Sequence, residues 1–298
     1  MSTNTAVFFG RICFTGYMTM TVDSAVSGID DRNNDAPKYL VALDVDGTLV
    51  DHDGVMSEGV REAARAVVDA GHHVIIATGR SLGALLPIVE MIGLRSGYGV
   101  CSNGGVTIRL DPALPLGYEV VDRVTFDPAP ALNALRERIP GALFALEDSE
   151  GNFLATSRFQ DASFGIEARG VDFQDLLDTE AVRVVVNSAE ASTQEFADAI
   201  AAAGLQGVTY AIGWSAWLDI AAAGVTKASA LEILRGTLQI DPSLTVAVGD
   251  GSNDIEMLRW AGRGVAMGQA DEEIKAVADE TAASVYDDGA ATVLRSLL

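Results

Sequence analysis

Short apolar runs recur along this chain, and each one is followed at once by polar residues or glycine. Tyr39–Leu43 precedes an aspartate, His73–Ala77 precedes a threonine, and Tyr98–Cys101 precedes a serine. Such runs are typical of strands that are buried on both faces of a parallel sheet. Between the first two, Ser57–Ala70 repeats its apolar residues at helical spacing and is followed by Gly71, a common helix stop. The pattern predicts an α/β fold with a doubly wound, mostly parallel, Rossmann-like core sheet.

The same rhythm of strand, polar loop and helix returns near the end of the chain. Leu244–Val248 is an apolar run that leads into Gly249–Asp254, and Gly264–Met267 follows a further helical segment. Ligands bind at the carboxyl ends of the strands in doubly wound sheets. The polar residues that follow the apolar runs are therefore the first candidates for chemistry.

The middle of the chain is organised differently. It reads as helix, strand, strand, helix, strand, helix, strand, strand, and one helix begins with a capping box of Ser192 and Glu195. This order is typical of an α+β unit and not of a continued wound sheet. The predicted boundaries are 1–37 for a poorly ordered N-terminal extension, 38–121 with 222–298 for the core, and 122–221 for an inserted α+β cap domain.

The charge balance restricts the partners of the chain. It has 20 basic and 42 acidic side chains, which give a net charge of −22. Nucleic acids and anionic membranes are not attracted to a net-negative protein, so we expect neither as a partner. Most of the acidic residues are expected on a solvated surface.

Cysteine usage and hydropathy point to the cell interior. Cys13 and Cys101 are too few for a disulfide framework or a cysteine-rich metal site, which fits a reducing compartment. No apolar run approaches the ~18 residues that a membrane-spanning helix needs. The first residues also lack the long apolar stretch of a secretory signal. We therefore predict a cytoplasmic protein. A monomer or a small homo-oligomer is expected, and the sequence leaves the choice open.

The sharpest motif is Asp44-Val45-Asp46-Gly47-Thr48, at the end of the first strand. Two carboxylates beside one opening repel each other unless a cation or a shared proton compensates them. One can act as a nucleophile and metal ligand, and the other as a general acid and base. Gly47 allows a sharp turn in which backbone N–H groups approach an anion. Taken alone, the motif also fits a metal-free polar turn, because Asp-Gly is common in turns.

Two further stretches carry polar or charged groups at the ends of predicted elements. Thr78-Gly79-Arg80 follows the second strand, where a hydroxyl and free N–H groups can hold phosphoryl oxygens. Lys227 stands at a predicted helix start, where the helix dipole does not favour a cation. Without the other motifs, a surface lysine is the more common interpretation of this residue.

The fourth stretch adds oxygen ligands. Gly249–Asp254 follows a buried strand and contains Asp250, Asn253 and Asp254. Oxygen-only ligands suit Mg²⁺, which keeps several waters and uses few protein carboxylates. The stretch therefore fits a magnesium site, and Ser252 or Asn253 also fits a helix N-cap, which does not exclude the metal.

Together the four stretches resemble the motifs of the haloacid dehalogenase-like (HAD) phosphohydrolase superfamily, in the order of that family. Only 32 positions separate Asp46 from Thr78, whereas 147 separate Arg80 from Lys227. The long interval leaves room for a cap between the second and third motifs. With this cap the chain resembles the Cof-type (HAD-IIB) sugar-phosphate phosphatases. Ser102–Gly105, and Trp217–Ile220 before Gly224–Lys227, also look Cof-like.

The resemblance implies a catalytic role for four residues. Asp44 is the implied nucleophile, which forms an aspartyl-phosphate. Asp46 is the implied general acid and base, which protonates the leaving alkoxide and then activates water. Thr78 and Lys227 are expected to stabilise the oxygens of the transferring phosphoryl group.

The resemblance also implies a set of binding residues. Mg²⁺ is expected on Asp44, the backbone carbonyl of Asp46 and Asp250, while Asp254 binds it directly or orients its waters. The residues implied in substrate and phosphate binding are Gly47, Gly79, Arg80, Asn103 and Asn253. Within the cap, Trp214 and Trp217 fit either core packing or stacking on a sugar.

These expectations define a Mg²⁺-dependent phosphatase, a phosphoric monoester hydrolase that acts on small phosphorylated metabolites such as sugar phosphates. Two alternatives stay open. A hexose phosphomutase would use the same site and return the phosphoryl group to the sugar. A non-catalytic phosphometabolite-binding protein would be expected to lack the nucleophile or the general acid, and here Asp44 and Asp46 are both present.

Overall fold

The structure is a computed structural model that describes residues 37–298, apart from 158–167, 189 and 213–215. The expected N-terminal extension, except residue 37, lies outside the described residues, as do Cys13 and Trp214. The described residues form two sheets, of eight and six strands. Among them, no helix has the length and hydropathy to cross a bilayer.

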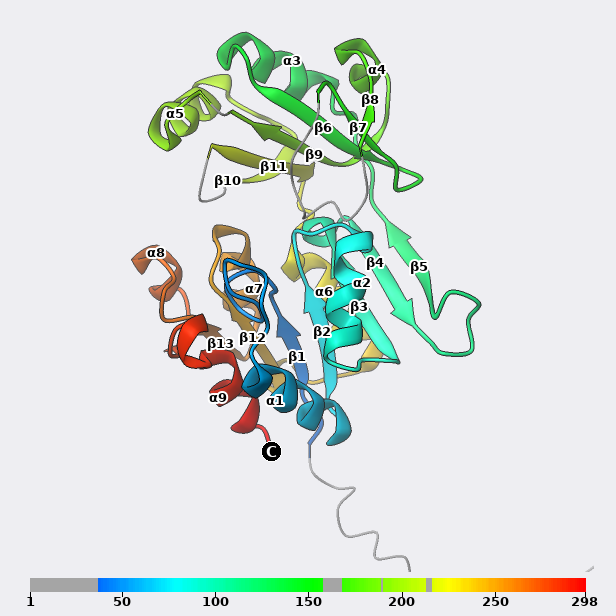
Figure 1. The fold of residues 1–298 in the computed structure, drawn as a ribbon, viewed down its shortest axis with the longest axis vertical. Helices are drawn as coiled ribbons and strands as arrows, with labels where there is room; N and C mark the ends of the chain where they lie inside the picture. The colour runs from blue at the N-terminus through cyan, green and yellow to red at the C-terminus, as the bar shows by residue number, and fades with distance from the viewer. Residues whose placement is uncertain (1–36, 158–167, 189, 213–215) are drawn as a thin grey trace, which may run out of the picture. The chain divides into compact units, whose positions relative to one another are not determined.

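The eight-stranded sheet has the order β14-β13-β12-β1-β2-β3-β4-β5 (Figure 1). Its strands from β14 to β3 are parallel, and β4 and β5 are antiparallel additions at one edge. The strands are β1 Leu40–Leu43, β2 His73–Ala77, β3 Gly97–Cys101, β4 Val106–Leu110, β5 Tyr118–Arg123, β12 Thr245–Gly249, β13 Arg263–Ala266 and β14 Glu280–Thr281.

Helices cover both faces of this sheet because its strands are apolar on both. Val41 and Leu43 of β1 belong to one buried cluster, and Leu40 and Ala42 to another. Each fully buried leucine or valine contributes roughly 1.5–3 kcal/mol relative to an exposed one. The first cluster is closed by α1 Glu58–Asp69, α2 Leu82–Met91 and α9 Gly289–Arg295, and the second by α6 Lys227–Leu238, α7 Ile255–Trp260 and α8 Glu272–Lys275.

The six-stranded sheet is mixed and has the order β10-β11-β9-β6-β7-β8. Its strands are β6 Leu143–Asp148, β7 Phe153–Ala155, β8 Arg169–Gly170, β9 Ala181–Asn187, β10 Val208–Ile212 and β11 Trp217–Ala222. Helices α3 Ala129–Arg138, α4 Phe173–Leu177 and α5 Thr193–Ala203 lie on one face of this sheet (Figure 1). Leu146, Val184 and Leu218 pack against those helices. The opposite face carries no helix among the described residues.

The predicted fold class is confirmed: a mostly parallel, doubly wound core sheet accompanies a second, mixed sheet that forms a cap. The segment 82–91 is a helix with Pro87 inside it, and β4 and β5 extend the core sheet, features that we did not predict. The domain boundaries stay a prediction. β5 continues to Arg123 and β11 to Ala222.

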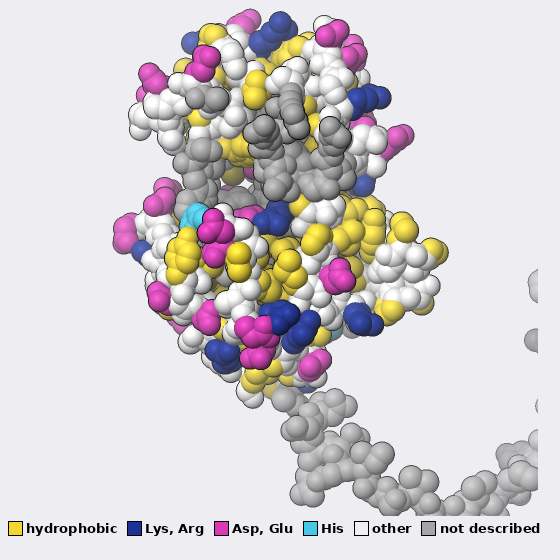
Figure 2. Space-filling view, in the orientation of Figure 1, with side chains coloured by type: hydrophobic (Ala, Val, Ile, Leu, Met, Phe, Trp, Pro, Cys, Tyr) yellow, Lys and Arg dark blue, Asp and Glu magenta, His cyan; other side chains and the backbone are white. Residues whose placement is uncertain are grey.

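Acidic side chains are spread over the face of the molecule seen in Figure 2, with basic ones interspersed, rather than gathered in one patch. This distribution fits the expectation that most of the −22 charge is a property of the solvated surface.

Candidate active site

The first strand ends in a turn that holds two aspartates in different environments. Asp44 is buried, and its N–H donates to the Val248 carbonyl of the neighbouring strand. Gly47 has a φ of +80°, and a Cβ at this position would lie 2.0 Å from Oδ2 of Asp250. Only glycine therefore permits both this turn and the close approach of the Asp250 carboxylate.

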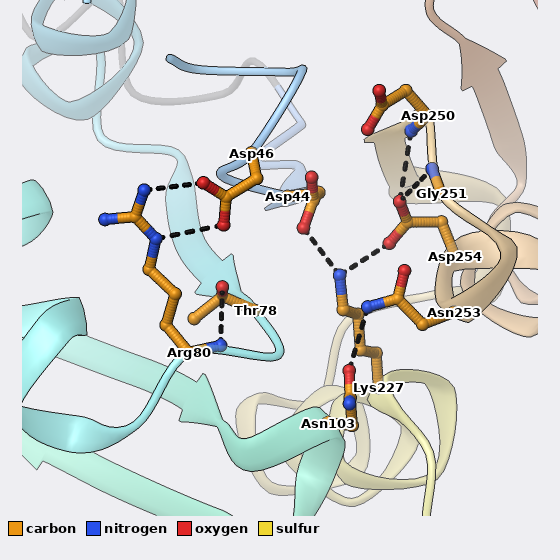
Figure 3. A network of polar contacts seen from close by, with 10 residues as sticks. All are labelled: Asp44, Asp46, Thr78, Arg80, Asn103, Lys227, Asp250, Gly251, Asn253 and Asp254. Carbon is orange, nitrogen blue, oxygen red and sulfur yellow. Dashed lines mark hydrogen bonds and ion pairs between the residues drawn. The ribbon is translucent and has the colours of Figure 1, made fainter. Parts of the chain in front are cut away.

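Lys227 is fully buried between two carboxylates (Figure 3). Its Nζ donates to Oδ1 of Asp44 at 2.6 Å and to Oδ1 of Asp254 at 2.7 Å. It is the first residue of α6, whose N-cap Thr226 accepts from the Ser229 N–H. Burial alone would lower the pKa of Lys227, but Asp254 and Asp44 outweigh that effect and raise the pKa. The interpretation as a surface lysine is therefore wrong.

Asp44, Asp250 and Asp254 form a buried cluster in which one oxygen from each lies within 4.8 Å of the others. Burial, and then the charge of Asp254, raise the pKa of Asp44 well above its usual value. The same two causes raise the pKa of Asp250 to about 7. Three carboxylates thus face one ammonium, and their oxygen donors fit a hard divalent cation that would neutralise the excess charge.

Asp254 has hydrogen bonds on both of its oxygens. Oδ1 accepts from Lys227, while Oδ2 accepts from the N–H groups of Asp250 at 3.0 Å and Gly251 at 2.9 Å. The side chain thereby orders the loop after β12 and aligns Lys227. Both oxygens of Asp254 are therefore engaged by protein donors, and its implied part in metal binding, direct or through water, stays a prediction.

The Asp46 side chain lies outside the three-carboxylate cluster and is exposed. Arg80 binds it with two hydrogen bonds, from Nε at 2.9 Å and from Nη2 at 2.5 Å (Figure 3). The pair is bidentate, the geometry in which guanidinium and carboxylate bind most specifically. Arg80 thus contacts Asp46, the expected general acid and base, and both residues line one cavity.

The other predicted site residues meet around the ends of β2 and β3. Thr78 is buried, and its hydroxyl oxygen accepts from the Arg80 N–H at 3.1 Å. Asn103 has a left-handed backbone, with φ of 54°, and its Oδ1 accepts from Nδ2 of Asn253 at 2.9 Å. A Cβ on Gly79 would lie 3.1 Å from that same oxygen. The structure therefore brings together all the residues that the motifs suggested.

Gln269 is a site residue that sequence reasoning missed. Its Nε2 donates to the Gly47 carbonyl at 2.6 Å and to Oδ2 of Asp250 at 3.1 Å, and its Oε1 accepts from the Val285 N–H. It thereby fixes the Asp250 carboxylate against the turn after β1. The one signal in the sequence is its place shortly after an apolar strand, at the sheet edge where ligands bind.

A cavity of about 460 Å³ opens in front of these groups. The eight-stranded sheet contributes Asp44, Asp46, Arg80 and Asp250, among others. The residues from the six-stranded sheet and its flanks are Arg183, Ala211, Ile212, Trp217 and Asp219. The site therefore lies between the two sheets, at the carboxyl ends of the core strands.

A doubly wound core, a cap, and a buried aspartate held by a lysine beside two further aspartates define a hydrolase of the HAD type. The chain matches the family model described as haloacid dehalogenase-like hydrolase over residues 41–294 and belongs to that family. The predicted family and the prediction of a HAD-type enzyme are thereby confirmed.

Two relatives illustrate the range of the family. The chain is 27% identical to 5-amino-6-(5-phospho-D-ribitylamino)uracil phosphatase YitU of Bacillus subtilis, over 86% of this chain and 96% of the relative. It is 29% identical to the phosphoglycolate phosphatase of Methanoculleus marisnigri, over 84% of this chain and 92% of the relative.

A solved structure, of the HAD subclass IIB sugar phosphatase BT4131, is similar in fold. It aligns with a TM-score of 0.73 and 24% identity, and covers 88% of this chain and all of its own. The Cof-type (HAD-IIB) architecture that the cap predicted is thus confirmed.

Proposed function

We propose that this HAD-type phosphatase, which acts on small phosphomonoesters, hydrolyses sugar phosphates with Mg²⁺ through an aspartyl-phosphate on Asp44. The observation that carries the proposal is the buried Asp44, bound to Lys227 and facing Asp250, at the floor of a 460 Å³ cavity. The relatives act on phosphate esters with different leaving groups, which supports the reaction class.

In the proposed first step, the Asp44 carboxylate attacks phosphorus and the bond from phosphorus to the ester oxygen breaks. Asp46 gives its proton to the departing alkoxide, which leaves as the alcohol. In the second step, Asp46 takes a proton from water, the water oxygen attacks the aspartyl-phosphate, and inorganic phosphate and Asp44 are released. Asp46 acts there as a carboxylate, the form that binds Arg80.

Lys227 and Thr78 are proposed to hold the equatorial phosphoryl oxygens. Lys227 reaches Asp44 directly, and Thr78 lies beside Arg80 at the end of the next strand. Preorganised donors of this kind stabilise charge that develops in the transition state. Asn253 and Asn103 are proposed to keep the two phosphate-binding loops together through their mutual hydrogen bond.

Asp44, Asp250 and the backbone carbonyl of Asp46 are proposed to hold Mg²⁺, with Asp254 as their support. The metal, when bound, neutralises charge between the attacking carboxylate and the phosphoryl oxygens. The donor set fits this ion because all of its groups offer oxygen.

The test of this function is phosphate release across phosphorylated sugars, nucleotides and cofactor precursors, with Mg²⁺ or with EDTA. We expect Mg²⁺-dependent release, highest with sugar phosphates. Release from nucleotides alone would contradict the substrate class, and an inactive protein would contradict the reaction.

A phosphomutase is separated from a phosphatase by incubation with glucose 1-phosphate and Mg²⁺. We expect free phosphate. Formation of an isomerised sugar phosphate without free phosphate would contradict the proposal and favour the transferase.

Removal of the divalent cation is expected to stop turnover and to lower thermal stability. Binding to the native state alone adds about 2.7 kcal/mol of stability when the metal is at 100 times its Kd. The measurement is phosphate release and the unfolding midpoint before EDTA, after EDTA and after re-addition of Mg²⁺. A midpoint and a rate that EDTA leaves unchanged would contradict a metal site at Asp44 and Asp250.

Gln269→Leu is expected to weaken Mg²⁺ binding by roughly 10- to 100-fold, because partners that orient a metal ligand contribute about this much. The substitution removes the bonds to Gly47 and Asp250. Calorimetric titration of the protein with Mg²⁺ measures the effect without turnover. Gln174→Leu, on the exposed surface of α4, is the matched control, and equal affinities in the two variants would contradict the positioning role.

A further inference from the structure

Three residues stand together on the face of the six-stranded sheet that carries no helix among the described residues. Arg183 lies on β9, and Trp217 and Asp219 lie two positions apart on β11. Side chains two apart on a strand point to the same face, and Asp219 pairs with Val185, two residues from Arg183. We call Arg183, Trp217 and Asp219 the cap triad.

The cap triad is joined by hydrogen bonds. Arg183 Nε donates to Oδ1 of Asp219 at 2.5 Å, and Trp217 Nε1 donates to Oδ2 of the same carboxylate at 3.2 Å. Arg183 is 3% exposed and Asp219 17% exposed at their side chains. All three residues line the cavity that also contains Asp44 and Asp46. A phosphoryl group on Asp44 would therefore direct its leaving group toward the triad.

The charge of Arg183 is already matched by carboxylates. Besides its ion pair with Asp219, Arg183 interacts electrostatically with the buried Glu147. Burial raises the pKa of Glu147, and the positive charges of Arg183 and Arg123 oppose that rise. On the core side of the cavity, Arg80 is engaged by Asp46. Each of the two arginines therefore already has a protein carboxylate as its counter-ion.

Among the described residues that line the cavity, the charged ones are mostly acidic. Two arginines stand against five carboxylates, which are Asp44, Asp46, Asp219, Asp250 and Asp271. Lys227, bound to Asp44, adds one positive charge at the phosphate end. A divalent cation at Asp44 and Asp250 would compensate the charges at the phosphate end only. At the far end, a second anion on the substrate would meet the like charge of Asp219, and Arg183 there is already paired with that carboxylate.

We propose that the cap triad binds the leaving group and selects a neutral, hydroxyl-rich one, a sugar or an alditol, over a leaving group with a carboxylate. Asp219 accepts hydrogen bonds from hydroxyl groups, Arg183 donates to them, and the Trp217 ring packs against the carbon face of the polyol. This inference rests on the proposed function, because it concerns the leaving group of the same reaction.

The test compares glucitol 6-phosphate with 6-phosphogluconate, which differ only in a terminal CH₂OH or carboxylate. We expect kcat/KM to be roughly 10-fold or more higher for glucitol 6-phosphate, because the acid meets the charge of Asp219. Equal values, or a preference for the acid, would overturn the inference.

Three variants assign the preference to the triad. Asp219→Asn removes the carboxylate charge, so we expect the ratio of the two kcat/KM values to shift roughly 10-fold toward 6-phosphogluconate. Asp219→Glu restores the charge and is expected to restore the preference. Asp198→Asn, which removes one charge from the exposed surface of α5, is the matched control and is expected to keep the wild-type ratio. The same ratio in Asp219→Asn and Asp198→Asn would overturn the inference.

The test also distinguishes failure of the inference from failure of the proposed function. p-Nitrophenyl phosphate has no polyol and reports the phosphatase reaction alone. Suppose that the protein hydrolyses p-nitrophenyl phosphate but shows no preference between glucitol 6-phosphate and 6-phosphogluconate. This result overturns the triad proposal and leaves the proposed reaction intact. No hydrolysis of any ester overturns the proposed function. The unfolding midpoint of each variant shows that the variant is folded.

Discussion

Asp44→Asn is expected to lower kcat for phosphate release by at least on the order of 10³-fold, because the amide cannot form an aspartyl-phosphate. The variant is expected to fold, since asparagine has nearly the same volume and its amide oxygen accepts from Lys227 as Oδ1 does now. Phosphate release under saturating Mg²⁺ and substrate measures the loss, and circular dichroism checks the fold.

Asp53→Asn is the matched control for this substitution. Asp53 is exposed and lies in the same segment after β1, so its loss changes the charge of the chain without touching the cluster. We expect turnover close to wild type. Turnover of Asp44→Asn above a few per cent of wild type would mean that the nucleophile is misassigned.

Lys227→Met is expected to destabilise the metal-free protein by roughly 3–5 kcal/mol, the usual effect of breaking a buried ion pair. The substitution leaves Asp44 and Asp254 buried without their shared cation. Urea unfolding in the presence of EDTA measures the change in the free energy of unfolding. Turnover is expected to fall as well, because a donor to the phosphoryl oxygens is lost.

Lys275→Met provides the comparison. Lys275 forms an exposed pair with Glu272 three residues earlier in α8, and such pairs contribute about 0–1 kcal/mol. We expect its free energy of unfolding to stay near that of wild type. Equal free energies of unfolding for Lys227→Met and Lys275→Met would contradict a stabilising role of the ion pairs that Lys227 forms with Asp44 and Asp254.

Much of the core is predictable because its strands carry a local signal. Buried parallel strands read as continuous apolar runs, and their polar C-terminal neighbours must meet at one edge of the sheet. The order of the amino acids alone therefore places Asp44 near Asp250. Lys227, 183 positions after Asp44, is identified by its motif, whereas its burial depends on contacts that the motif does not encode.

The cap side of the site is not predictable in the same way. Arg183 reads as an ordinary polar residue of a strand, and its burial depends on Asp219, which lies 36 positions later. Trp217 fits either core packing or a sugar site by its sequence; in the structure it packs against a small apolar cluster and lines the cavity. Gln269 acts through contacts with Gly47 and Asp250, which no local pattern encodes.

A very short linker connects the last strand of the six-stranded sheet to the core. Ala222, the last residue of β11, lies five positions before Lys227, the first residue of α6. A tight turn, in which the Val225 N–H donates to the Ala222 carbonyl, fills most of the gap. The strand that carries Trp217 and Asp219 thus runs almost directly into Lys227, which binds Asp44.

This linker constrains how caps can be exchanged between relatives, by evolution or by design. A transplanted cap would carry its own residues at the cavity, but its last strand and linker must have the same length and twist up to Lys227. One residue inserted in the linker would shift Lys227 away from Asp44 or turn Asp219 out of the cavity. Domain shuffling in this protein is therefore restricted at this return linker, where one stretch of backbone carries Trp217, Asp219 and Lys227.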